Sequence, residues 1–154
     1  MPRESSIGVV RAIALDLDAV LADTRPAWRD WLDDAARRAR VDLSALPEDR
    51  VAAAAELDER LGDWRPLLER FAADRGPLHF RPRPEVSAAL RRLAAAGTRI
   101  GAFTDAPREL AEIALAHAGA ARRIEAVGTL EDVRRELGGD PLVVRSRDAL
   151  VALP

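Results

Sequence analysis

Residues 12–24 read Ala-Ile-Ala-Leu-Asp-Leu-Asp-Ala-Val-Leu-Ala-Asp-Thr. The apolar run from Val9 to Leu15 predicts a buried strand, and it ends in two carboxylates, Asp16 and Asp18. Open α/β sheets bind ligands in the crevice outside the carboxyl ends of their strands, so both acids are candidate site residues. The alternative is that they only end the strand and begin a turn, as Asp commonly does.

Length and composition are those of a globular protein with one hydrophobic core. The chain has 154 residues, of which 48% are hydrophobic, and this fraction excludes a disordered chain. Its formal net charge is −2 with scattered arginines, so no nucleic-acid surface is expected. There is no cysteine, which excludes disulfides and thiolate chemistry. No stretch reads as a membrane span or a signal peptide, so we expect a cytoplasmic protein without a membrane partner.

Beyond the first strand, a helical block precedes an alternation of strands and helices. Alternating strands and helices indicate parallel β-α units with right-handed crossovers. The block is expected to contain helices at about 24–40, 48–61 and 64–73, with Gly76-Pro77 ending it. The elements expected after it are a helix at 84–96, a strand at 99–103, a helix at 107–117, a strand at 124–128, a helix at 129–137, a strand at 141–144 and a short helix at 146–153. Trp28, Trp31 and Trp64 are predicted to form the small core of the helical block.

Two motifs in this order resemble a known family. Asp16-x-Asp18 followed by Leu-Ala-Asp-Thr at 21–24 resembles the first motif of the haloacid dehalogenase-like (HAD) superfamily. A later strand that ends in Thr104, after an amphipathic helix closed by Ala-Gly, resembles the second motif. The helical block directly after the first motif is similar to the C1-type cap of phosphoglycolate-phosphatase-like members. The resemblance extends from about residue 9 to residue 119.

The resemblance implies the fold class and the domain organisation. We expect a reduced Rossmann-like α/β core of about four parallel strands in three layers, formed by residues 1–24 and 79–154. A small all-helical cap, residues 25–78, is expected as an insertion after the first strand.

The resemblance also implies a chemistry. Asp16 would be the nucleophile that attacks a phosphorus atom, and Asp18 the general acid and then the general base. Mg²⁺ would be held by Asp16 and by the backbone carbonyl of Asp18. Thr104 would bind a phosphate oxygen, and Asp105, which stands where relatives have an asparagine, would lie in the same phosphate-binding set. The leading expectation is therefore a Mg²⁺-dependent phosphatase that acts on a small phosphorylated metabolite through an aspartyl-phosphate.

The chain departs from the family's third and fourth motifs. The third motif is a lysine, sometimes an arginine, but this sequence has no lysine and Thr129-Leu130 stands at the expected position. The fourth motif is an acidic pair after a strand, whereas the matching strand here runs into Arg-Ser-Arg-Asp at 145–148. Arg145 is either a surrogate cation for phosphate or the group that closes an inactive metal site. The alternative function is a HAD-derived binding or interaction protein without catalysis. A homodimer that completes the site is a third hypothesis.

Overall fold

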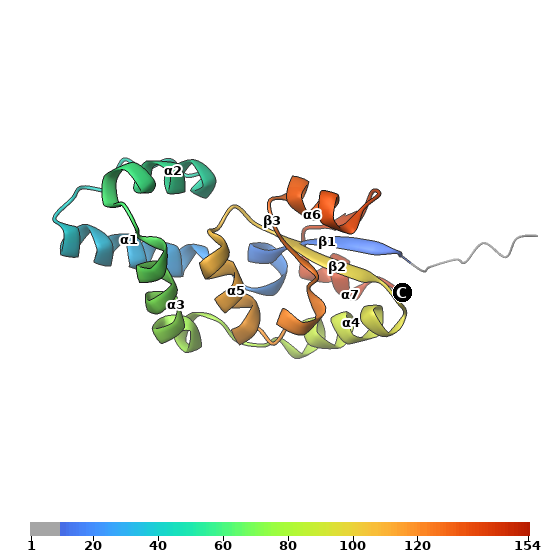
Figure 1. The fold of residues 1–154 in the computed structure, drawn as a ribbon. Coiled ribbons are helices and arrows are strands. Elements are labelled where there is room, and N and C mark those ends of the chain that lie inside the picture. The colour runs from blue at the N-terminus through green and yellow to red at the C-terminus, as the bar shows by residue number, and fades with distance from the viewer. Residues whose placement is uncertain (1–9) are drawn as a thin grey trace, which may run out of the picture.

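The structure is a computed structural model that describes residues 10–154 (Figure 1), so the predicted start of the first strand at Val9 lies outside the described residues. Four parallel strands form one sheet in the order β3-β2-β1-β4, which makes β1 an internal strand. Their bounds are β1 (Ala12–Asp16), β2 (Arg99–Phe103), β3 (Ala126–Gly128) and β4 (Leu142–Val144).

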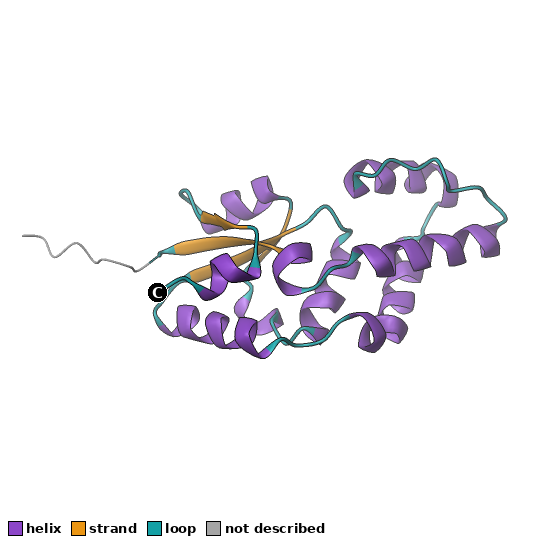
Figure 2. Cartoon of the chain, turned by 180° about the vertical axis from the view of Figure 1, so that it is seen from behind, coloured by secondary structure: helices purple, strands orange, loops and turns teal. Residues whose placement is uncertain are grey.

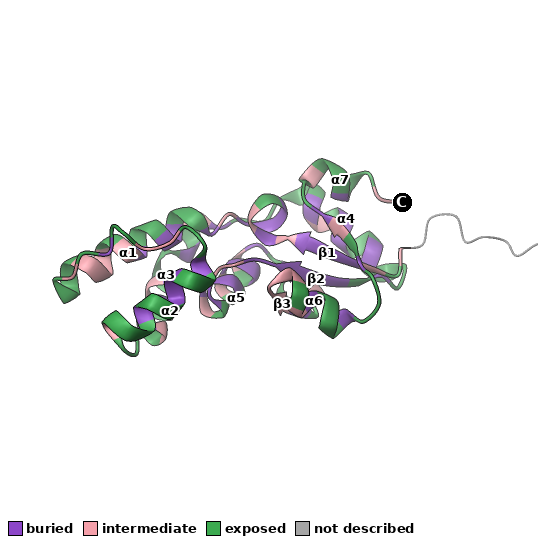
Figure 3. Cartoon of the chain, turned by 90° about the horizontal axis from the view of Figure 1, so that it is seen from above, coloured by how far each residue is buried: buried purple, intermediate pink, exposed green. Residues whose placement is uncertain are grey.

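Helices cover both faces of the sheet and give the predicted three-layer α/β core (Figures 1 and 2). One face packs against α4 (Pro84–Ala95), α5 (Arg108–His117) and α7 (Arg147–Val151), and the other against α6 (Leu130–Leu137). The short 3₁₀ helix η2 (Ala121–Arg123) precedes β3. Strand side chains alternate between faces, so Ile13 and Leu15 join the first cluster and Ala14 joins the second. Both central strands are therefore mostly buried, as Figure 3 shows.

A helical insert, residues 25–79, lies beyond the carboxyl ends of the strands, at the end of the sheet opposite the C-terminus (Figures 1 and 2). It consists of α1 (Arg25–Ala39), α2 (Arg50–Leu61) and α3 (Arg65–His79). The rings of Trp28, Trp31 and Trp64 pack at centroid distances of 5.4 to 6.2 Å, which confirms the predicted tryptophan core. The same hydrophobic cluster includes residues of α5, so the insert is packed on the α/β core.

The third helix is longer than predicted. The Gly76-Pro77 pair was expected to end it, but α3 continues to His79 with Pro77 inside it. Pro77 has no N–H to donate, yet the last turn of the helix is closed by a hydrogen bond from Phe80 N to Gly76 O at 2.8 Å. A Cβ at Gly76 would lie 2.4 Å from the His117 ring, so the glycine allows α3 to pack closely on α5. The predicted boundary was therefore wrong because tertiary packing outweighs the local signal.

No helix within residues 10–154 is both long enough and apolar enough to cross a lipid bilayer.

Candidate active site

The ends of β1 and β2 lie side by side and open into one pocket. Asp16 is paired in register with Phe103, and Thr104 follows it with its N–H 2.8 Å from Gly128 O of β3. A pocket of about 460 Å³ lies at this edge of the sheet. It is lined by Asp16, Asp18, Arg25, Asp49, Arg50, Val51, Phe103, Thr104, Asp105, Thr129 and Leu130. The structure thus brings Asp16, Asp18, Thr104 and Asp105 together.

Asp16 begins a single turn of π-helix, η1 (Leu17–Leu21), which carries the chain out of the sheet. The side chain of Asp16 accepts a hydrogen bond from Ala19 N at 3.2 Å, and Ala22 N donates to Leu17 O at 2.9 Å. Leu17, Val20 and Leu21 are buried, which anchors the turn in the core. Among the described residues, the Ala19 N–H is the only hydrogen-bond donor to the Asp16 carboxylate. One face of this carboxylate therefore remains available to a ligand.

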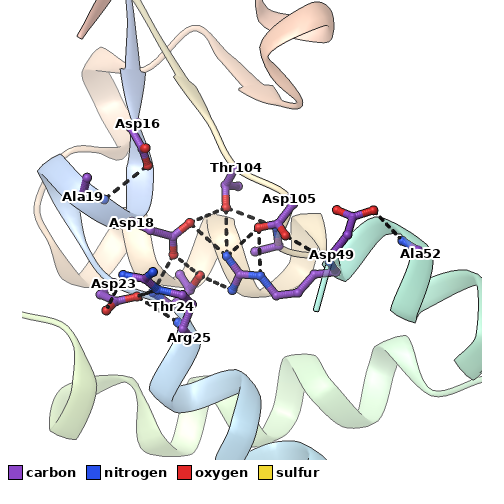
Figure 4. Close-up of polar contacts among 12 residues, drawn as sticks. Asp16, Asp18, Ala19, Asp23, Thr24, Arg25, Asp49, Ala52, Thr104 and Asp105 are labelled. Atoms are coloured by element: carbon purple, nitrogen blue, oxygen red, sulfur yellow. Dashed lines mark hydrogen bonds and ion pairs between the residues drawn. The ribbon is translucent and has the colours of Figure 1, made fainter. Parts of the chain in front are cut away.

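Asp18 is held by donors on both of its carboxylate oxygens (Figure 4). Its Oδ1 accepts from the backbone N–H of Thr24 at 2.8 Å and from the Thr24 hydroxyl. Its Oδ2 accepts from the Thr104 hydroxyl at 2.7 Å and from Arg50 at 2.9 Å. Each carboxylate oxygen of Asp18 therefore accepts two hydrogen bonds in this arrangement.

Arg50, which the sequence analysis did not single out, lies at the centre of the site. It is the first residue of α2, whose N-cap Asp49 accepts from Ala52 N at 3.2 Å. Its exposed fraction is 3%, and no other charged residue between positions 10 and 154 is buried. Besides Asp18, its guanidinium donates to the Thr24 hydroxyl at 2.7 Å and approaches the Thr104 hydroxyl at 3.4 Å.

Asp105 is the second acidic partner of Arg50. Its Oδ1 lies 2.8 Å from Arg50 Nη2 and 3.0 Å from Nε, and its Oδ2 accepts from the backbone N–H of Arg50 at 3.0 Å. Partial burial alone would raise the pKa of Asp105, but the hydrogen bonds and the positive charge of Arg50 outweigh it and hold the pKa below its ordinary value. Asp105, predicted to bind phosphate, is therefore engaged as an anchor for the helical insert.

Arg145, predicted to bind phosphate or to close the metal site, lies outside the site pocket. Its guanidinium lies over the ring of Phe103, with Cζ 5.2 Å from the ring centroid, and it does not line the pocket. No ion pair joins Arg145 to Asp16 within the part of the chain that the structure describes. Backbone register brings Arg145 to this edge, but stacking on an aromatic face decides where its side chain lies. The next residue, Ser146, caps α7.

The donor set does not fit the predicted Mg²⁺ ion. Mg²⁺ requires several oxygen ligands in near-octahedral geometry. The predicted ligands are only two, the Asp16 carboxylate and the Asp18 backbone carbonyl, and the Asp18 side chain cannot add a third because Arg50 and two threonines occupy it. In residues 10–154, no three acidic or histidine side chains are grouped so that they could hold a metal ion. Thr129, at the expected lysine position, forms a capping box with Asp132 and offers no charge.

A local signal for Arg50 exists, but it is shared by other helices. A basic residue in the first turn opposes the helix dipole and therefore needs a compensating partner. Arginine, however, is the first residue of α1, α2, α3, α5 and α7. Only the tertiary structure separates Arg50 from the other four, because it alone is buried.

The fold and the pocket define a three-layer α/β protein with an acid-lined site at the carboxyl edge of its sheet and a helical insert above that site. The family model for haloacid dehalogenase-like hydrolases matches residues 10–143. The chain therefore belongs to the haloacid dehalogenase-like hydrolase family.

Among solved structures, two matches show what the chain is similar to. One is the L-2-haloacid dehalogenase from Xanthobacter autotrophicus, with a TM-score of 0.49 and 17% sequence identity over 88% of this chain and 69% of that one. Another is the same enzyme with chloropropionic acid covalently bound, with a TM-score of 0.49 and 16% identity over the same shares. No curated protein matches the sequence.

Proposed function

We propose that this HAD-like hydrolase acts on a small phosphorylated metabolite, with Asp16 as the nucleophile. The observation that carries the proposal is the position of the Asp16 carboxylate. It lies at the carboxyl end of an internal strand, lines a pocket of about 460 Å³, and accepts only one backbone hydrogen bond among the described residues. A carboxylate held by one donor can still approach an electrophile.

The proposed reaction has two steps. An Asp16 oxygen forms a bond to phosphorus while the bond from phosphorus to the leaving oxygen breaks, and that oxygen takes a proton from water, which gives an aspartyl-phosphate and an alcohol. Water then attacks the phosphorus, which releases phosphate and restores the carboxylate. Asp18 lines the same pocket, but it can assist proton transfer only after one of its present hydrogen-bond donors moves away. We therefore expect slow turnover with this arrangement of Asp18 and Arg50.

The remainder of the substrate has space on the side of the insert. A cavity of about 740 Å³ lies between α1 and the segment 41–48, and it shares Arg25, Arg50 and Asp105 with the site pocket. Its walls include the apolar side chains of Leu32, Val41 and Leu46. This space exceeds what a two-carbon phosphate ester fills, and it accommodates a longer leaving group.

A second candidate function is binding without catalysis. It is favoured by the state of Asp18, whose two oxygens are engaged by Thr24, Thr104 and Arg50. The loss of one preorganised electrostatic group costs about 10²–10³ in rate in other enzymes. A site without the lysine of the third motif and the acidic pair of the fourth is therefore compatible with binding alone.

The two candidates are separated by phosphate release from a chromogenic aryl phosphate, measured with MgCl2 and with a chelator. The hydrolase proposal predicts release by the unmodified protein and none above background by Asp16→Asn. Asp23→Asn is the matched control, because Asp23 is on the same segment but does not line the site pocket. Equal rates for the unmodified protein and Asp16→Asn would overturn the hydrolase proposal.

Two further measurements complete the test. Calorimetric titration with an aryl phosphonate, which cannot be hydrolysed, would detect binding without turnover and support the second candidate. Halide release from 2-chloropropionate is measured in parallel, because carboxylate attack on carbon uses the same nucleophile. If halide release depends on Asp16 and no phosphate is released, the proposed substrate class would be halogenated rather than phosphorylated.

A further inference from the structure

Two arginines line the site pocket, and only Arg50 pairs with carboxylates at the carboxyl edge of the sheet, because Arg25 is exposed and paired with Asp23. Asp16, Asp18 and Asp105 all line the site pocket, and like charges this close repel each other unless a cation or a proton lies between them. Arg145 does not supply the cation, because it stacks on Phe103 outside the pocket. The buried cation is Arg50.

The Arg50 guanidinium contacts several oxygen atoms at once, as a bound metal ion would, but it does so by donating hydrogen bonds to them. Its Nη2 lies 2.9 Å from Asp18 Oδ2 and 2.8 Å from Asp105 Oδ1, so one nitrogen joins the two carboxylates. Its other nitrogens reach the Thr24 hydroxyl and Asp105 again. A guanidinium has five N–H donors and no acceptor, and it keeps its charge at any pH at which proteins fold.

We propose that the Arg50 guanidinium is the fixed counter-ion of this site and takes the place that a divalent cation would otherwise have between its carboxylates. The site is then assembled without Mg²⁺ and does not bind it in the presence of Arg50. This inference goes beyond the proposed function and does not depend on turnover. It makes the helical insert, which carries Arg50, a part of the core site.

Removal of the guanidinium tests the proposal, because it leaves the two carboxylates that share Arg50 Nη2, Asp18 and Asp105, without a cation between them. These oxygens are suitable ligands for a divalent cation. The probe is Mn²⁺, titrated into the full chain and followed by the electron paramagnetic resonance signal of the free ion. We expect no saturable binding by the unmodified protein at millimolar Mn²⁺. We expect Arg50→Met to bind Mn²⁺ tighter by about tenfold or more, and Arg50→Met/Asp18→Asn to lose that gain.

Arg50→Lys is the matched control, since it keeps the charge and should not gain Mn²⁺ binding to the same extent. Circular dichroism shows whether each variant is folded. If Arg50→Met is unfolded, the Mn²⁺ titration is carried out on the unmodified protein and on Asp16→Asn only. Absence of Mn²⁺ binding by the unmodified protein then supports the proposal. Saturable Mn²⁺ binding by the unmodified protein that Asp16→Asn abolishes would overturn it. Binding by a folded Arg50→Met no tighter than that of the unmodified protein would also overturn it.

Failure of this proposal and failure of the hydrolase proposal are distinguishable. Mn²⁺ binding is measured without substrate, whereas phosphate release is measured with it. A protein that releases no phosphate and binds no Mn²⁺ would refute the hydrolase and support Arg50 as the counter-ion.

Discussion

Arg50 Nη2, on the helical insert, lies 2.9 Å from Asp18 Oδ2, on the segment that follows the first strand of the core. The side chain of Arg50 is 4% exposed and that of Asp18 is 12% exposed, so this ion pair is largely shielded from water. Because shielded charges interact strongly, the pair connects the position of the insert to the geometry of the site. The site is therefore formed by the insert and the core together.

Arg50→Met should destabilise the protein strongly. Removal of one partner of a buried ion pair leaves an uncompensated charge, at a typical cost of about 3–5 kcal/mol. The matched control is Arg108→Met, which breaks an exposed pair with Glu112 at 2.8 Å, a type of contact worth about 0–1 kcal/mol. The free energy of unfolding in urea measures both effects. Equal losses for the two variants would contradict a special role for Arg50.

Asp105 should make stability depend on acid pH. Its pKa is lowered in the folded protein, so its contribution is complete above the ordinary Asp pKa of about 3.9 and is lost as the pH falls through the lower folded value. We expect Asp105→Asn to be less stable than the unmodified protein at neutral pH. The difference should shrink as the pH falls below about 4. Urea midpoints measured from neutral to acid pH give the curve, and a difference that grows on acidification would contradict the assignment.

Gly101→Ala should separate β2 from α6. A Cβ at Gly101 would lie 2.5 Å from Val133 Cγ1, and overpacking of this kind costs about 1–3 kcal/mol. Val133→Ala removes the obstructing methyl groups, so the double variant should lose less stability than the sum of the two single variants. Thermal unfolding of the four proteins measures this coupling. Additive losses would show that the two residues do not meet.

Thr129→Ala should weaken α6 through the loss of its cap. The Thr129 hydroxyl accepts from Asp132 N at 3.2 Å, and the Asp132 carboxylate accepts from Thr129 N at 3.1 Å. Loss of such a cap typically costs about 1 kcal/mol. Unfolding in urea measures the cost, and Thr129→Ser, which keeps the hydroxyl, should retain most of the stability. If the serine variant lost as much as the alanine variant, the hydroxyl would not be the stabilising group.

Local patterns were sufficient for most of the fold. The apolar run before Asp16 and the Arg99–Phe103 segment are strands, and Thr129 begins a helix, because periodicity and capping act over neighbouring residues. Parallel strands place their carboxyl ends at one edge of the sheet, and because β1 pairs with β2, Asp16 and Thr104 lie in one pocket.

The remaining features of the site depend on contacts between residues far apart in the sequence. Arg50 and Asp105 are separated by 55 positions, and no local pattern of either residue indicates the other. Arg145 follows β4 as the sequence predicts, but the sequence does not indicate that its side chain stacks on Phe103. Tertiary packing decides both cases.

The claim that Asp16 is the reacting carboxylate is tested most directly by trapping the intermediate. The protein is mixed with an aryl phosphate, quenched in acid and digested, and the peptide that contains Asp16 is examined by mass spectrometry. We predict that a fraction of this peptide gains one phosphoryl group, and that the gain disappears in Asp16→Asn. A phosphoryl group on another residue, or phosphate release with no modified peptide, would contradict the claim.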